Sequence, residues 1–137
     1  WIRHPRKVVQ SFAKVIPNVT AEDIGLDQEW QQWQKVARLP GKKIIVDSDE
    51  MLADPARTLP RICEALELAW CPEMLSWPAG AKAYDGPWAK HWYSNVHQST
   101  SFGPPKALPE PLVTEHEKVV EAALPAYLSL FSNRFKF

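Results

Sequence analysis

The chain lacks the features that mark membrane proteins, disulfide-rich secreted proteins and nucleic-acid-binding proteins. Its 137 residues include only two cysteines, too few for a disulfide framework. No apolar run approaches the roughly 20 residues that a membrane span needs, and no signal-peptide pattern stands at the start. Sixteen basic and sixteen acidic residues cancel, so no global field attracts nucleic acid or an acidic membrane. We therefore expect a cytoplasmic protein in which any anion site is local.

Two kinds of site are disfavoured by how glycine and histidine are spread. The glycines are isolated: Gly25, Gly41, Gly80, Gly86 and Gly103. None is followed by Lys-Ser or Thr-Thr, so no loop resembles the Gly-rich kind that wraps backbone N–H groups around a phosphate. The histidines are equally dispersed: His4, His91, His97 and His116. We expect no metal site.

Proline and tryptophan, in contrast, are abundant. Thirteen prolines and seven tryptophans concentrate toward the second half, which predicts long ordered loops that bury aromatic rings. The length fits one domain over residues 1–137. Because the chain begins with Trp1 instead of Met, we expect it to be the C-terminal part of a longer protein.

Local patterns predict an α/β domain that is mostly helical. The β-branched run at 43–47 reads as a buried strand, and with an earlier strand at the N-terminus it predicts a short parallel sheet. Thr20 should cap a short turn that Gly25 closes, and Asp54 should cap a later helix in which Pro60 causes a kink or a delayed start. Expected helices cover about 5–16 (ended by Pro17), 26–39, 55–68, 72–76 and 112–131. Residues 77–111 should form a loop.

The first of these helices carries a candidate anion site. Pro5 suits a first helical position, and the dipole of the helix favours an anion at its start. Arg3 adds a planar, permanently charged donor group beside free amides, and His4 and Ser11 fall on nearly the same face. The alternative is a solvated arginine beside an ordinary capped helix.

This spacing, Arg-x-Pro with a serine eight residues after the arginine, resembles the P-loop sulfotransferases. The resemblance implies a partial P-loop NTPase-like three-layer fold. It also implies that Arg3 and Ser11 hold the 3′-phosphate of the sulfate donor 3′-phosphoadenosine 5′-phosphosulfate (PAPS). A second stretch, Ser48 to Pro55 followed by an amphipathic helix, is similar to the family signature Tyr-Glu-Asp-Leu-x-x-Asp-Pro, with serine replacing tyrosine and the two acids exchanged. Helix capping explains these acids equally well.

The third resemblance lies in residues 81–92, which are similar to the family loop Arg-Lys-Gly-x-x-Gly-Asp-Trp-Lys-Asn-His-Phe. In the family this loop folds over the 3′-phosphate. The implied roles are a mobile charge for Lys82, a tight turn for Gly86 and an apolar cover for Trp88. Departures from the pattern occur at Ala81, Ala83, Pro87 and Ala89. Two family cations are thereby lost, and Lys90 could replace part of their charge.

His91 and His97 are the histidines of this loop region. Either could accept the proton of an attacking hydroxyl, because imidazole titrates near neutral pH. The alternative for a lone loop histidine is polar surface. The family's own catalytic histidine precedes the Arg-x-Pro segment and, like the phosphosulfate loop, has no counterpart here.

The sequence therefore predicts the 3′-phosphate-binding half of a PAPS-dependent sulfotransferase, which transfers a sulfuryl group to a small-molecule hydroxyl or amine without a metal. By itself this chain should not catalyse the transfer. Two alternatives stay open: a nucleotide-dependent P-loop phosphotransferase, and a degenerate fragment whose aromatic loop and last helix form an interaction surface. The substitutions at Ala81, Pro87 and Ala89 favour the last of these modestly.

Overall fold

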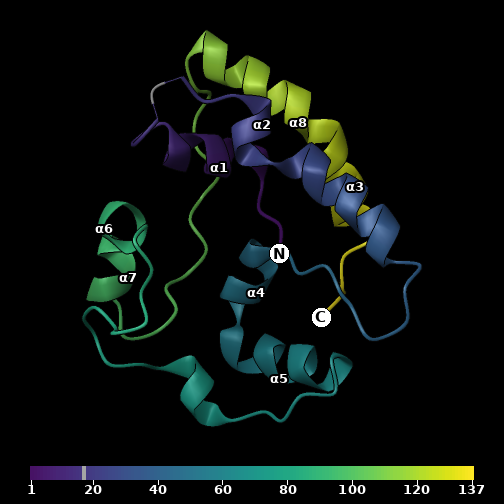
Figure 1. The fold of residues 1–137 in the computed structure, drawn as a ribbon, viewed down its shortest axis with the longest axis vertical. Coiled ribbons are helices and arrows are strands. Elements are labelled where there is room, and N and C mark those ends of the chain that lie inside the picture. Colours follow the sequence, from purple (N-terminus) through teal and green to yellow (C-terminus); the bar gives the residue numbers. More distant parts are fainter. Residues whose placement is uncertain (17) are drawn as a thin grey trace.

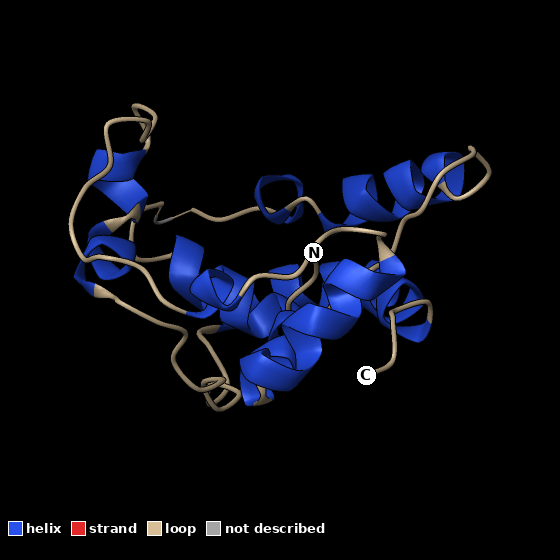
Figure 2. Ribbon diagram, turned by 90° about the horizontal axis from the view of Figure 1, so that it is seen from below, coloured by secondary structure: helices blue, strands red, loops and turns tan. Residues whose placement is uncertain are grey.

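The computed structural model describes residues 1–16 and 18–137, and it is mostly helical (Figure 2). In chain order the helices are α1 (Pro5–Phe12), α2 (Ala21–Ile24), α3 (Leu26–Val36), α4 (Ser48–Ala53), α5 (Pro55–Ala65), the 3₁₀ helix η1 (Pro72–Leu75), α6 (Ala89–Trp92), α7 (Ser94–Gln98) and α8 (Thr114–Ser132). The long α8 packs against α1 and α3, while α6 and α7 stand at one side of the molecule (Figure 1). No helix within the described ranges is long and apolar enough to cross a membrane.

Helix starts follow the capping chemistry that the sequence predicts. The Thr20 hydroxyl accepts the Asp23 N–H at 3.3 Å, and the Asp23 carboxylate accepts the Thr20 N–H at 2.9 Å. Gly25 then closes α2 with a φ of 71°, a left-handed conformation that glycine adopts without a steric penalty. Asp54 accepts the Arg57 N–H at 3.1 Å at the start of α5. A delayed start for α5 is wrong, because the helix begins at Pro55 and includes Pro60.

The short parallel sheet is not shown. Ile2 and Asp47 form a single parallel bridge, in which the Ile2 N–H donates to the Val46 carbonyl at 2.8 Å and the Ser48 N–H donates to the Ile2 carbonyl at 2.9 Å. The rest of segment 43–47 is extended but carries no strand in the part of the chain that the structure describes. Because the backbone turns into α1 at Pro5, only Ile2 lies in register for pairing.

The core is built where α8 covers the N-terminal half of the chain. Its main cluster consists of Ile2, Leu26, Ile45, Ala123, Ala126, Tyr127 and Leu130. Trp30 and Trp33 are half-buried and pack against this cluster, so both rings contribute to the core. A second cluster joins α1 to α8 through Val9, Val19 and Val120, and a third lies between α4 and α5. Cys63 is also buried, as a small hydrophobic residue.

Some helix ends differ from the predicted positions. α1 ends at Phe12 instead of continuing to 16, because the Val15 N–H donates to the Phe12 carbonyl and tightens the chain into a turn. The expected stop at Pro17 lies outside the described residues. α3 ends at Val36, and the final helix runs from Thr114 to Ser132.

Residues 77–111 are less uniform than the expected loop. An antiparallel bridge between Ser76 and Ser101 closes the base of a lobe that contains α6 and α7. At this base the Trp77 N–H donates to the Thr100 carbonyl at 2.9 Å, and the Trp77 ring meets Phe102 edge-on at 5.0 Å. Residues 77–101, the aromatic lobe, therefore form an ordered unit. From this lobe the chain continues through the extended segment 102–113 to α8 (Figure 1).

The contribution of α8 to stability can be measured at two leucines of the same helix. Leu130 is 2% exposed in the main core cluster, whereas Leu128 is 53% exposed. We expect Leu130→Ala to lower the free energy of unfolding by about 3 kcal/mol, because it removes buried methyl groups and leaves a cavity. Urea titration checks this, with Leu128→Ala as the control. Equal losses in the two variants would contradict the assignment of the core face.

Candidate functional site

The start of α1 is closed by the side chain of His4. Its Nδ1 accepts the Arg6 N–H at 3.2 Å, and its carbonyl accepts the N–H groups of Lys7 at 3.0 Å and Val8 at 3.3 Å. Burial, followed by the charges of Arg6 and Lys7, lowers the pKa of His4, which favours the neutral ring that this bond requires. The expectation of free amides beside Arg3 is therefore wrong, since Pro5 has no N–H and the next three amides are occupied.

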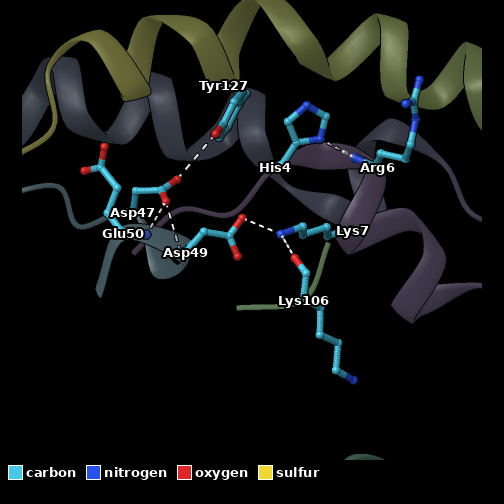
Figure 3. A network of polar contacts seen from close by, with 8 residues as sticks. All are labelled: His4, Arg6, Lys7, Asp47, Asp49, Glu50, Lys106 and Tyr127. Atoms are coloured by element: carbon cyan, nitrogen blue, oxygen red, sulfur yellow. Dashed lines mark hydrogen bonds and ion pairs between the residues drawn. The ribbon is translucent and has the colours of Figure 1, made fainter. Parts of the chain in front are cut away.

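Lys7 is the buried cation of this region, and sequence reasoning missed it. Its side chain is 7% exposed, and Nζ donates to an Asp49 carboxylate oxygen at 2.6 Å and to the carbonyl of Lys106 (Figure 3). The pair thus joins α1, α4 and the extended segment 102–113. In the sequence, the only indication that Lys7 belongs to the site is its position four residues before Ser11 on the same helix.

Asp47 lies on the other side of the same network. It is 2% exposed and accepts the N–H groups of Asp49 at 3.0 Å and Glu50 at 3.1 Å, which starts α4. Burial raises the pKa of Asp47, although these two amides pull it down. The Tyr127 hydroxyl donates to Asp47 at 3.4 Å, and its ring meets His4 edge-on at 5.3 Å (Figure 3). Burial and the Asp47 charge raise the pKa of Tyr127.

Besides Arg6 Nε, two buried polar atoms in this network have no hydrogen-bond partner among the described residues. They are the hydroxyl oxygen of Ser48, a residue that is 8% exposed, and the second carboxylate oxygen of Asp49. Each is an acceptor, and only the hydroxyl can also donate. Lys7 is already paired with Asp49, and Arg6 is paired with Glu117 through Nη2 while its buried Nε–H stays unused.

The two predicted clamp residues flank α1. Arg3 precedes the helix and is half-buried, and its side chain has no hydrogen bond or ion pair to any residue in 1–16 or 18–137. Ser11 lies in the last turn and is exposed, likewise without a side-chain partner in those ranges. From Pro5 to Ser11 the axial rise is roughly 9 Å. The structure does not bring the two side chains into contact.

The remaining predicted residues belong to the aromatic lobe. Trp88, Lys90 and His91 are exposed, and Trp88 reaches 70% exposure. The amine of Lys82 donates to the Pro78 carbonyl at 2.6 Å, so part of its donor capacity is used inside the lobe. A tight turn that needs glycine at Gly86 is not found, because its φ is not positive and an added Cβ would meet open space.

His97, unlike His91, has an acidic partner. Its Nε2 lies 2.8 Å from the Asp85 carboxylate, which also accepts the Lys82 N–H at 2.8 Å. Tyr93 meets the imidazole edge-on at 6.0 Å. The Lys82 amide first, and His97 after it, lower the pKa of Asp85. Sequence reasoning proposed His97 but missed Asp85, whose only signal was its place inside the family-like loop.

The lobe contacts α1 through one aromatic pair. Trp92 at the end of α6 lies 5.2 Å from Phe12, with the rings tilted by 44°. Phe12 follows Ser11 directly, so the lobe adjoins the serine end of α1 and not the arginine end. Trp77 supports the base by donating its indole N–H to the Ser99 hydroxyl at 3.2 Å.

Comparison with known proteins decides the family. A family model described as "Sulfotransferase domain" matches residues 1–134. The chain belongs to the sulfotransferase family. No solved structure matches it. Within the described residues, no group of three or more histidine, cysteine, aspartate or glutamate side chains could hold a metal ion.

Two curated relatives of this sulfotransferase domain come from Arabidopsis thaliana. The chain is 36% identical over 132 residues to branched-chain-amino-acid aminotransferase-like protein 1, which covers 96% of the chain and 24% of the relative. It is 33% identical over 126 residues to branched-chain-amino-acid aminotransferase-like protein 2, covering 92% of the chain and 22% of the relative. The chain thus spans about a quarter of the length of these relatives.

The Lys7–Asp49 pair should contribute measurably to stability. We expect Asp49→Asn to lower the free energy of unfolding by about 2 kcal/mol, because it leaves the buried Lys7 ammonium without its anion. The control is Lys42→Gln, which breaks the Lys42–Glu67 pair, with side chains 59% and 71% exposed. That change should cost less than about 0.5 kcal/mol. Urea unfolding that shows equal losses would contradict a central role for Lys7.

The Asp85–His97 contact predicts a pH dependence of the lobe. Because the folded pKa of Asp85 is lowered, its contacts stabilise the lobe above the usual aspartate range and are lost as the pH falls through the lowered pKa. Titration of the Asp85 carboxyl carbon by NMR should show a higher midpoint in His97→Gln. The matched variant His91→Gln should leave the midpoint unchanged. The contact would be refuted by an identical midpoint in all three proteins.

Proposed function

We propose that this domain supplies the 3′-phosphate-binding side of a PAPS-dependent sulfuryl-transfer site. The observation that carries the proposal is the state of the cations around α1. Arg6 pairs with Glu117 at 3.0 Å and Lys7 pairs with Asp49 at 2.6 Å, whereas Arg3 has no partner within the described ranges. A half-buried guanidinium with all its donors unused suits a phosphate, which accepts two parallel hydrogen bonds from it.

The residues of this chain fit the sulfate donor PAPS in part. Arg3 and Ser11 offer unused donors along α1, and Lys90 offers a cation on the adjoining lobe. Trp88 is exposed and can cover the nucleotide to exclude water. The loss of family cations at Ala81 and Ala89 leaves the phosphate more dependent on Arg3. Bound PAPS would supply an activated sulfuryl group for in-line transfer to a hydroxyl or amine.

Transfer of the sulfuryl group requires a base that takes the proton of the attacking hydroxyl or amine. The lobe contains two histidines that could do so. We assign the role to His97 before His91, because Asp85 faces Nε2 of His97 and so favours the tautomer with a free lone pair on Nδ1. Nδ1 would hold the acceptor proton, while the Asp85 carboxylate stabilises the resulting imidazolium. His91 is exposed and has no side-chain partner within the described residues.

An interaction surface is the second candidate function. Exposed aromatic rings on the lobe favour it, since Tyr84 is 85% exposed and Trp88 is 70% exposed. A nucleotide site and a protein-binding lobe make opposite predictions for nucleotide affinity. The phosphotransferase alternative differs from both in preferring ATP.

Binding of 3′-phosphoadenosine 5′-phosphate distinguishes these functions. Calorimetric titration of the natural full-length polypeptide should show binding that weakens about tenfold or more in Arg3→Ala, because a charge-assisted hydrogen-bond pair is lost. Arg38→Ala, which removes an exposed arginine after α3, is the control and should bind normally. Equal binding by Arg3→Ala would refute the clamp. Absence of binding would refute the sulfotransferase assignment, and preference for ATP would favour the phosphotransferase.

A further inference from the structure

A cavity of about 410 Å³ lies between the start of α5 and the segment that follows α8. Three cations line it: Arg57, Arg134 and Lys136. Its volume falls in the range of pockets that hold small molecules. None of these three cations belongs to the residues assigned to PAPS, although Glu50, Ala53 and Asp54 of the lining lie in the stretch 48–55 that resembles a family signature. The proposed function gives the three cations no role.

The acids of the cavity are already engaged. Asp54 accepts the Arg57 N–H at 3.1 Å as the cap of α5, and Glu50 accepts from Arg134 Nη2 at 2.5 Å. Among the side chains of the lining, three cations against these two carboxylates leave one positive charge in excess. The uncompensated charge favours an anionic occupant.

Arg134 is held in place from several sides. Besides Glu50, its Nη1 donates to the Phe131 carbonyl at 2.9 Å, and its guanidinium carbon lies 3.6 Å from the Phe131 ring centroid. Its Nε–H is buried without an acceptor among the described residues. These contacts fix the Arg134 side chain, which forms a rigid and positively charged part of the cavity wall.

Arg57 and Lys136 are the exposed cations of the cavity wall. Both are exposed, and neither side chain has a hydrogen bond or ion pair to a residue in the described ranges. Ala53 and Phe137 complete the lining with apolar surface. The wall therefore combines unpaired donors for a charged group with carbon surface for the body of a molecule.

We propose that this cavity binds a small organic anion, a phosphate or carboxylate group on a compact carbon body. Arg57 and Lys136 bind the charged group, and the body packs on Ala53 and Phe137. The site stands apart from the PAPS proposal, because it uses neither Arg3 nor the aromatic lobe.

NMR titration of the isotope-labelled full chain tests the site with three probes of similar size: phenyl phosphate, phenylacetate and the neutral benzyl alcohol. We expect at least one of the anions to shift the amides of 53–58 and 134–137, and benzyl alcohol to leave them unchanged. Arg57→Gln and Lys136→Gln should each weaken that binding about tenfold. The matched controls Arg38→Gln and Lys35→Gln remove exposed cations of the α3 region and should bind normally.

Three outcomes would overturn the proposal. They are the absence of shifts with both anions at millimolar concentration, shifts of equal size with benzyl alcohol, and undiminished binding in both cavity variants. Because Arg57 and Lys136 are exposed and unpaired within the described part of the chain, both variants should fold, and circular dichroism verifies this. The anion that binds more tightly identifies the charged group, phosphate or carboxylate, that the cavity prefers.

Discussion

The arrangement around α1 depends on the need of one buried lysine for an anion. An ammonium group that is 7% exposed is costly to bury alone, so Lys7 holds Asp49 at 2.6 Å and fixes α1 against α4. The same Nζ also binds the Lys106 carbonyl, which draws segment 102–113 across the helix. Asp49 lies two residues after Asp47, whose carboxylate starts α4. The positions of the arginine before α1 and of the lobe beyond it follow from this anchoring.

Local chemistry was predictable from the sequence, whereas pairing across the chain was not. The caps at Thr20 and Asp54 depend on neighbours three residues away, and the structure contains both. The parallel sheet required two extended segments far apart in sequence to stay in register, and only Ile2 does so. Lys7 resembles any solvent-facing helical lysine in the sequence, because its partner Asp49 is 42 positions away. Asp85 was missed although one of its partners, the Lys82 amide, is only three residues away, because the family pattern gives this position no role.

The aromatic lobe preserves the outline of the family loop with a different distribution of charge. The Lys82 amine donates a hydrogen bond to the Pro78 carbonyl. Alanine occupies two positions that are cationic in the family pattern. What holds the lobe together is instead Asp85, which receives both a backbone amide and His97. Its contact with α1, Trp92 on Phe12, is apolar and needs no phosphate for its formation. Under the proposed function, a lobe held by these contacts would lose less conformational entropy on binding a nucleotide.

The pairing of cations around α1 also sets how an anionic ligand meets the protein. Arg6 and Lys7 form ion pairs, and the chain as a whole is neutral. Other charges of the chain therefore add little to the positive potential around Arg3. At physiological salt such a field is screened within about 8 Å. Under the proposed function, a nucleotide would reach the site by unassisted diffusion, and its association rate would change little with ionic strength. Selectivity would then reside in the dissociation rate of the correctly bound nucleotide.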